Sequence, residues 1–488
     1  MKYYTFIILL ILCSNSVWGQ TDSRDTVNCN PASVRFERQV KPKAGFAALE
    51  LVGLDAIFWG ASKFVAGKPF ADISLATIKK NLDTGFVWDN DEFPTNLVAH
   101  PYQGGLYFSA GRAWGLSFLQ SIPYAFTGSF IWEMFLENEP ASINDLITTT
   151  IGGMAYGEVM HRCSDRFVCY DQRGVKRLGK ELIAAVIDPA KAVKRLSTGE
   201  LWAYDPGYQR IDVKEELRIQ AGARYIGNQR GTGEWNPIIS LKYTYNDPFD
   251  VSGRIPFEYF ELDGMFNIGD HQPLLGEIRI TGLLFGETIK PNWLIGGFQQ
   301  YNYMNSERVS NSVNKQEIPF RIAETAAFGV GSIWEKEIVR NVNVRSDLYL
   351  TGVLLGSYYS DYYRFGKRDY TYGSGFSYRA NIKFDLWTNV SLFAQTEGIE
   401  LFNPQSYRWS DTVNKNQLYL NIQGDRGRSY VTKQQASVAV DLWKGLGLSL
   451  IYSHYNRFVK EFNPYNSRII SYNFSNQDIR LQLSYTFH

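Results

Sequence analysis

The chain has 488 residues, a formal net charge of +1 and a mean hydropathy of −0.25, and it contains 31 tyrosines and 31 phenylalanines. The nearly balanced charge gives no reason to expect a nucleic-acid partner. Soluble domains rarely carry so many aromatic side chains, whereas a transmembrane β-barrel presents them to lipid. The composition therefore favours a membrane barrel over a soluble enzyme or a nucleic-acid-binding protein.

Residues 1–19 have the pattern of a cleaved secretory signal peptide: a charged start, a short apolar run and a small-residue exit that ends at Gly19. The apolar run is too short to cross a bilayer as a helix. Leu12 stands before Cys13 where lipoprotein processing requires a small residue, which favours cleavage over a lipid anchor. We expect export to the outer membrane of a Gram-negative bacterium, and a flexible segment at residues 20–42.

Export would place Cys29, Cys163 and Cys169 in an oxidising compartment, where a disulfide persists. Cys163 and Cys169 are close enough in sequence to close a small loop, and we favour that pairing while the partner of Cys29 stays open. Three such cysteines do not make a four-ligand zinc pattern, so we expect a structural role for them and no cofactor.

Residues 43–205 are predicted to form a helical domain that is unusually apolar for the periplasm. The expected helices are Ala44 to Val65, Gly104 to Leu119, Ile122 to Glu137 and Ile143 to His161. Charged residues interrupt these segments, so none predicts a transmembrane helix by itself. Glycines such as Gly104, Gly153 and Gly157 permit close helix packing, either within a bundle or against the barrel.

Polar residues of this domain supply the candidate site. Ser142 and Asp145 are explained as a helix cap. The residues that capping leaves unexplained are His100, Arg112, Glu133, Glu158 and His161. Glu158 and His161 share one helical face and are weak candidates for a metal site, whereas His100 or His161 near Glu133 or Glu158 would make an acid–base pair. The alternative that we favour is an internal network, such as Arg112 with Glu133, that holds the bundle together.

Residues 206–488 are predicted to form an antiparallel transmembrane β-barrel of about twelve strands, with ten to fourteen as the range. The apolar period becomes two from about Lys214 onward. In the last strand Ile479, Leu481, Leu483 and Tyr485 fall on one face. Two tight turns, at residues 385–389 and 441–445, each carry a tryptophan and are typical of periplasmic hairpins. Longer polar stretches near residues 305–316, 359–368 and 403–428 are the expected extracellular loops. The fold class is thus α+β.

Charged residues within the strands lie on the parity opposite the apolar set and should point into the lumen: Arg279, Glu324, Arg345, Asp347, Arg379 and Lys383. We expect them to pair and fill a narrow barrel rather than line a pore. His454 falls on the outward face. Outer-membrane phospholipases place a His–Ser pair on that face, but no His-x-Ser follows here, so an interfacial histidine is favoured.

The helical domain resembles an uncharacterised family of exported bacterial proteins in which a domain of unknown function precedes an outer-membrane barrel. The resemblance covers roughly residues 45–205 and rests on these motifs: Asn96-x-x-x-His100-Pro101, Arg112-x-x-Gly115, Trp132-Glu133, Asn144-Asp145-Leu146, Gly152-Gly153, Gly157-Glu158 and Asp188-Pro189. It implies the architecture and the location but no activity. It also singles out Asn144 and Asp145 beside His100, Arg112, Glu133 and Glu158.

Three functions remain open from the sequence. The favoured one is a non-enzymatic outer-membrane protein whose helical domain plugs the barrel, docks beneath it or binds an envelope partner. The second is a lipid- or envelope-modifying enzyme with its site in the helical domain, and the third is a small-solute channel gated by that domain. The expected partners are outer-membrane lipid, an envelope protein and the machinery that assembles barrels.

Overall fold

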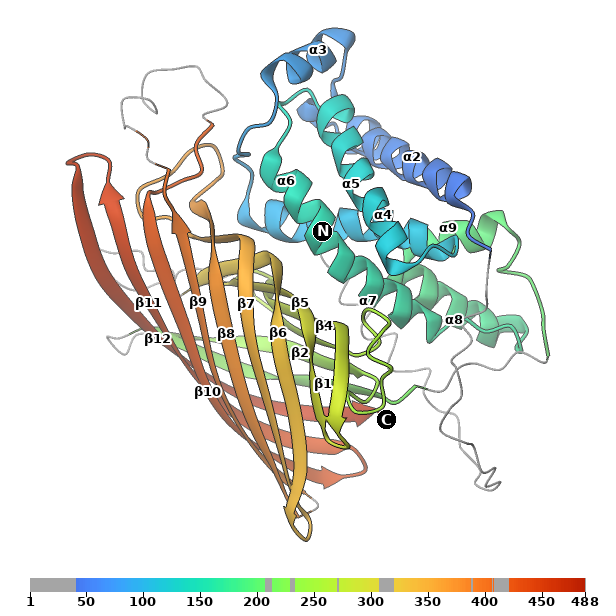
Figure 1. Cartoon of the computed structure of the whole chain (residues 1–488), viewed down its shortest axis with the longest axis vertical. Helices are drawn as coiled ribbons and strands as arrows, with labels where there is room; N and C mark the ends of the chain where they lie inside the picture. Colours follow the sequence, from blue (N-terminus) through green and yellow to red (C-terminus); the bar gives the residue numbers. More distant parts are fainter. Residues whose placement is uncertain are drawn as a thin grey trace.

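The computed structural model describes residues 41–206, 213–228, 233–269, 272–306, 320–387, 389–405, 407 and 421–487. The predicted signal peptide, Cys29 and the final residue His488 lie outside these ranges, as do most of the two loop segments expected near residues 305–316 and 403–428. A helical domain (residues 41–206) precedes a closed β-barrel (residues 213–487), and the two lie side by side (Figure 1).

The helical domain is built on four long helices joined by short connections. Each of the first three consists of one α-helix with a π-helical turn at one end. The fourth consists of two α-helices with a π-helical turn between them. In chain order they are α2 (Ala44–Gly60) with η2 (Ala61–Val65), η4 (Thr95–Ala99) with α4 (His100–Ala113), α5 (Phe118–Ile131) with η5 (Trp132–Leu136), and α6 (Ile143–Ile147), η6 (Thr148–Gly152) and α7 (Gly153–Asp165). The shorter elements are η3 (Pro69–Ala71), α3 (Leu75–Thr84), α8 (Gly174–Ile187) and α9 (Pro189–Ser197).

Local signals fix where these helices begin and end. Ser142 accepts a hydrogen bond from the Asp145 N–H, so the predicted cap is confirmed. The expected helix from Gly104 to Leu119 was wrong at both ends. It begins at Thr95 and stops at Ala113, because Gly115 has a φ of 84° and Ser117 then caps α5.

The barrel has twelve antiparallel strands, each paired with its chain neighbours and closed by β1 against β12. The predicted barrel and strand number are confirmed. The strands are β1 (Glu215–Asn228), β2 (Gly233–Tyr245), β3 (Phe260–Asn267), β4 (Leu275–Lys290), β5 (Trp293–Asn305), β6 (Arg321–Val339), β7 (Val342–Tyr359), β8 (Tyr370–Leu386), β9 (Val390–Asn403), β10 (Gly427–Trp443), β11 (Leu446–Asn463) and β12 (Arg468–Phe487).

The two ends of the barrel differ. At one end, here called the turn end, short hairpins join β4–β5, β6–β7, β8–β9 and β10–β11, and both barrel termini lie there because Leu217 pairs with Phe487. The predicted hairpin tryptophans, Trp387 and Trp443, are 66% and 69% exposed at this end. The longer connections, β5–β6, β7–β8 and β9–β10, lie at the opposite loop end.

The outer wall of the barrel is apolar where nothing covers it. Leu448, Leu450, Leu481 and Leu483 are 43–52% exposed on the outward parity of β11 and β12. Their neighbours on the other parity, such as Ser449 and Gln482, are buried in the lumen. This alternation is that of a lipid-facing barrel.

Charged and apolar side chains fill much of the lumen among the described residues. Near its middle, Arg279 bonds Glu397 at 2.6 Å and Lys433 bonds Glu277 at 2.8 Å across the barrel, which confirms that interior charges pair. Beyond this belt, a cluster of inward-facing side chains fills the half nearer the loop end: Ile226, Met304, Phe320, Ile322, Ala327, Val353, Tyr358, Ile399, Leu401, Val431 and Tyr455. On the turn-end side a cavity of about 1150 Å³ remains, with acidic and basic side chains in its lining.

The helical domain neither plugs the barrel nor lies beneath it. Asn302 points into the lumen, where it bonds Glu397, so its neighbours Tyr301 and Tyr303 point outward. Both tyrosines are fully buried, because Tyr156 and Phe93 of the helical domain pack on them. Figure 1 shows the helices beside the wall that β4, β5 and β6 form. The domain is therefore fixed to the outside of the barrel.

This interface runs along the height of the barrel. At the loop end the Asn96 amide donates to the hydroxyls of Tyr370 and Tyr372, at 2.9 and 2.7 Å. At the turn end, Arg166 forms an ion pair with Glu215 at 2.8 Å. A shared apolar core joins the two parts: Phe93, Leu97, Phe108, Phe118, Met154 and Val159 from the helices, with Phe260, Ile280, Tyr301, Tyr303, Ala323 and Leu355 from the strands.

Candidate functional site

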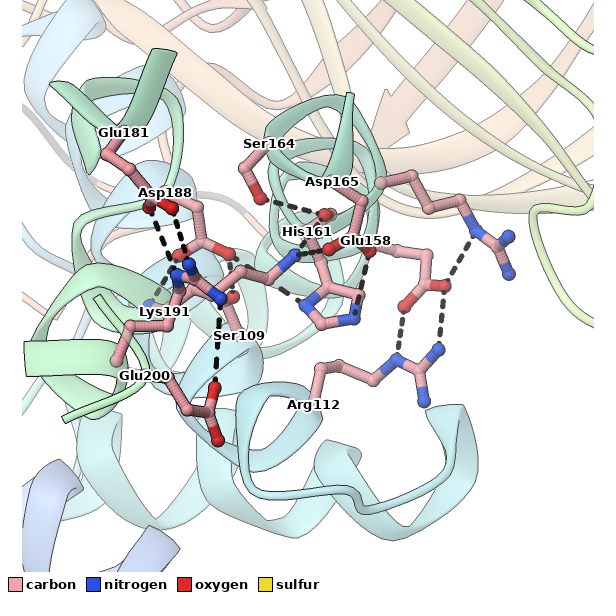
Figure 2. Close-up of polar contacts among 12 residues, drawn as sticks. Ser109, Arg112, Glu158, His161, Ser164, Asp165, Glu181, Asp188, Lys191 and Glu200 are labelled. Carbon is pink, nitrogen blue, oxygen red and sulfur yellow. Dashed lines mark hydrogen bonds and ion pairs between the residues drawn. The ribbon is translucent and has the colours of Figure 1, made fainter. Parts of the chain in front are cut away.

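A fully enclosed charge of the helical domain is the Glu158 carboxylate on α7, which has no exposed surface. Arg112 on α4 donates to both of its oxygens, at 2.8 and 3.3 Å, and Arg162 donates to one of them at 2.8 Å. Figure 2 shows the Arg112 guanidinium directed at this carboxylate. The network that we favoured from the sequence therefore exists, but its partner for Arg112 is Glu158 and not Glu133.

Glycines bring α4 and α7 close enough for this contact. A Cβ on Gly157 would lie 2.6 Å from the carbonyl oxygen of Gly105, and one on Gly153 would lie 2.6 Å from the carbonyl carbon of Gly104. Real side chains do not fit at such distances, so the small residues set the spacing of the two helices. The predicted role of these glycines is confirmed.

A second group of polar side chains surrounds His161, one turn further along α7 (Figure 2). The His161 ring lies between two carboxylates, with Nε2 3.8 Å from Asp165 and Nδ1 3.9 Å from Asp188. The Nδ1 atom is buried and makes no hydrogen bond among the described residues. Lys191 joins this group by donating to Asp165 at 2.7 Å.

Asp188 connects three elements at this place. It caps α9 by accepting the Lys191 N–H at 3.0 Å, and it also accepts a hydrogen bond from the Ser109 hydroxyl on α4. Burial has the largest effect and raises the pKa of the Asp188 carboxyl, although the Lys191 ammonium acts in the opposite direction. Sequence reasoning noted Asp188-Pro189 as a motif but did not link it to His161, because nothing in the spacing brings α9 onto α7.

The remaining candidates lie near the loop end. Asn144 accepts the Asp89 N–H at 2.8 Å and donates to Asp145 at 2.8 Å, and His100 lies 3.8 Å from Asp145. Glu133 is 2% exposed and accepts the Ser142 N–H at 2.8 Å. These contacts join the caps of the helices to the segment that docks on the barrel.

The candidate residues therefore form two groups instead of one pocket. His100 begins α4 and Arg112 lies twelve residues later, which corresponds to about 18 Å along a helix. Both oxygens of Glu158 bond to arginines, and no group of three or more His, Cys, Asp or Glu side chains suited to a metal occurs among the described residues. The geometry is that of an internal ion network.

The favoured disulfide was wrong. Cys163 and Cys169 are both unpaired thiols. Cys163 packs at the interface with the barrel, where Tyr243 is a neighbour, whereas Cys169 follows the end of α7 beside Val168 and Tyr170. Short separation in sequence did not bring the two side chains together, because α7 continues to Asp165 and carries Cys163 on its barrel-facing side.

His454 faces outward on β11, as expected, but it has a partner that the sequence did not reveal. Its Nε2 lies 3.2 Å from the hydroxyl oxygen of Ser475 on β12. His454 lies opposite Gln477 in the pairing register, and Ser475 stands two residues from Gln477 on the same face of β12, so a diagonal contact across strands replaces the His-x-Ser spacing. The His454 Nδ1 makes no hydrogen bond among the described residues.

Comparisons with known proteins bear on both parts of the chain. The barrel is similar to that of an outer-membrane channel from Pseudomonas putida F1 (9% identity, 58% of this chain and 99% of that chain, TM-score 0.28). It is also similar to the NanC porin (7%, 55% and 98%, TM-score 0.27) and to the outer-membrane protein OmpT of Vibrio cholerae (8%, 58% and 100%, TM-score 0.24). At these identities the likeness concerns the fold alone. No protein of curated function matches the chain.

The helical domain matches a family that is described only by its lack of an assigned role. The match spans residues 85–190, which include the six residues that the resemblance singled out and exclude α2. The chain thus carries a domain of unknown function, DUF3943, at residues 85–190, ahead of a closed twelve-stranded β-barrel.

Proposed function

We propose that this chain is an integral outer-membrane protein in which the barrel is a closed anchor and the helical domain on its outer wall is the functional part. The apolar outward parity of the strands and the exposed tryptophans at the turn end support a place in the outer membrane. The expected signal peptide agrees with that location.

The observation that carries this proposal is the packing of side chains inside the barrel. An open channel needs a continuous aqueous path, but the belt of ion pairs and the apolar cluster around Tyr358 and Tyr455 occupy the barrel from its middle toward the loop end. In addition, the outward faces of several strands pack against the helical domain. The outer wall of the barrel, rather than its lumen, therefore carries the contacts that we link to function. A structural or partner-binding role fits these contacts best.

Conductance in planar lipid bilayers tests this function. We expect the purified full-length chain to insert without giving open-channel steps. A double variant, Tyr358→Ala with Tyr455→Ala, should give steps or a raised leak, because two large inward side chains are removed. A matched double variant at outward positions, Leu448→Ala with Leu450→Ala, should remain silent. Regular open steps from the unsubstituted protein would refute the closed anchor and favour the solute channel.

A lipid- or envelope-modifying enzyme is the second candidate, and His161 is the observation in its favour. The ring lies between Asp165 and Asp188 and has a buried nitrogen with no hydrogen bond among the described residues. Incubation with labelled outer-membrane lipids would decide it. Product formation that disappears in His161→Gln, while thermal stability is retained, would support catalysis, whereas no product from the unsubstituted protein would exclude these lipids as substrates.

A further inference from the structure

The helical domain has an unusual distribution of polarity, with charged side chains inside and apolar side chains outside. We propose that this domain lies within the lipid bilayer beside the barrel, so that its four long helices cross the membrane together with the strands. The inference rests on the proposed outer-membrane location of the barrel and adds a second, α-helical membrane domain that contacts lipid directly.

The first support comes from the length of the helices. By their bounds the four run over 22, 19, 19 and 23 residues, at 44–65, 95–113, 118–136 and 143–165. At 1.5 Å per residue these correspond to about 29–35 Å, close to the hydrocarbon thickness of about 30 Å. Soluble helices are usually shorter, with a mean of about 11–12 residues.

The second support comes from the direction of the helices. The fourth helix begins near the loop end, where Asn144 bonds the segment at Asp89, and finishes near the turn end, where Arg166 pairs with Glu215. The second helix begins at the same loop end with Asn96 against Tyr370. The fourth helix thus spans the distance between the two ends of the barrel that the strands connect, and the second helix starts at the same end as the fourth.

The third support comes from the helix α2 with its continuation η2, which contributes no residue to the shared core. Its exposed side chains are Phe46, Leu49, Val52, Ile57, Phe64 and Val65, which are 52–86% exposed. Its acidic residues Glu50 and Asp55 are 8% and 2% exposed, because they face Trp114 and Tyr107 of the bundle. Water would favour the opposite arrangement, whereas lipid favours this one.

The expectation that no apolar span is long enough for a membrane helix is therefore revised. Among the described helices, Ala44–Val65 is long and apolar enough to cross a membrane, and most of it is not buried by protein. The two carboxyls that interrupt it in the sequence point away from the proposed lipid. Lysines stand at both of its ends, Lys41 and Lys43 before it and Lys63 and Lys68 near its close, where their ammonium groups can reach the two surfaces of the bilayer.

The helices α8 and α9 continue the same pattern at the turn end. On α8, Val175, Leu178, Leu182 and Val186 are 41–85% exposed along one face, and Lys176 and Lys180 lie beside them. Trp202, which follows α9, is 70% exposed. An amphipathic helix with flanking lysines and a nearby tryptophan is typical of a segment that lies in the interfacial plane. The helices and the outward faces of β11 and β12 thus both present exposed apolar side chains, and we assign lipid as the occupant of both surfaces.

Spin labels on single cysteines in α2 test the proposal, in the full-length protein reconstituted in lipid vesicles. Leu49→Cys, Val52→Cys and Ile57→Cys place the label on the exposed side, where no packing is disturbed. Leu450→Cys on the outward face of β11 is the lipid reference, and Arg340→Cys in the β6–β7 turn is the aqueous reference. The unsubstituted protein gives the background from Cys29, Cys163 and Cys169.

We expect the α2 labels to match Leu450, with strong relaxation by oxygen and a several-fold weaker relaxation by a polar nickel chelate than at Arg340. If the α2 labels match Arg340 while Leu450 remains shielded from nickel, the helical domain lies in water and the inference is wrong. If Leu450 is also open to nickel, the proposed location of the barrel itself fails. The references thus separate the failure of the inference from the failure of the function on which it depends.

Discussion

The Glu158 carboxylate allows a quantitative test of the ion network, through the substitution Arg112→Ala. The carboxylate has no exposed surface, and Arg112 supplies two of the three hydrogen bonds that it receives. Removing one partner of a buried ion pair typically costs about 3–5 kcal/mol. Because Arg162 still neutralises the charge, we expect the lower end, about 3 kcal/mol, which corresponds to a fall in Tm of about 6–12 °C.

The assay is thermal unfolding of the helical signal in detergent, followed by circular dichroism at 222 nm. Lys176→Ala, at an exposed position on α8, is the control and should shift stability by less than about 0.5 kcal/mol. Arg112→Ala combined with Glu158→Gln should be more stable than Arg112→Ala alone, because no half-paired carboxylate is then buried and the amide oxygen still accepts the hydrogen bond from Arg162. A single variant as stable as the control, or a double variant with additive losses, would refute the reasoning.

Three further predictions concern packing, docking and the thiols. Gly104→Ala should destabilise the helical domain by about 3 kcal/mol in the same thermal assay, since its Cβ would lie 1.8 Å from the Thr149 carbonyl oxygen, whereas Gly53→Ala, with nothing within 4 Å, should be neutral or stabilising. Asn96→Ala should lower the free energy of unfolding by about 1–3 kcal/mol, because it removes the hydrogen bonds to Tyr370 and Tyr372. Proteolysis between α2 and α4 should then be faster, and an unchanged rate of digestion would contradict this anchoring role. Peptide mapping without reductant should recover Cys163 and Cys169 as separate thiols, and a linked peptide would show the structure to be wrong there.

The barrel could be predicted because its signal is local and repeated. Alternation of two residues fixes which side chain faces lipid, and Ile479, Leu481 and Leu483 obey it without exception. Tight hairpins with Trp387 and Trp443 then follow from the turns between strands. The parity of Arg279 and Arg345 also predicted that they point inward, although their partners Glu397 and Glu261 on other strands could not be read from spacing.

The contacts of the helical domain were harder to predict from the sequence, because they join segments that are distant in the chain. The pairing of Arg112 with Glu158 depends on the glycine-mediated approach of α4 and α7, and that of His161 with Asp188 depends on where α9 returns. Glu50, Asp55 and Lys63 interrupt the apolar run of α2, so the sequence predicted no membrane-spanning helix there. Only the structure shows that the described part of the chain leaves most of this helix uncovered.

The carboxyls of Glu50 and Asp55, buried against the bundle, have a further consequence for the export of the chain. For a protein exported through the inner membrane, as residues 1–19 predict, a strongly apolar helix would be arrested there by the translocon. Each central aspartate raises the free energy of such insertion by about 2.5–3.5 kcal/mol. Two acidic groups within α2 would thus let the segment pass as a secreted polypeptide, and the folded bundle then supplies Trp114 and Tyr107 as their hydrogen-bond partners. In this chain the two acidic side chains would prevent insertion into the inner membrane while they are exposed in the unfolded chain. Folding then buries them and leaves an apolar surface.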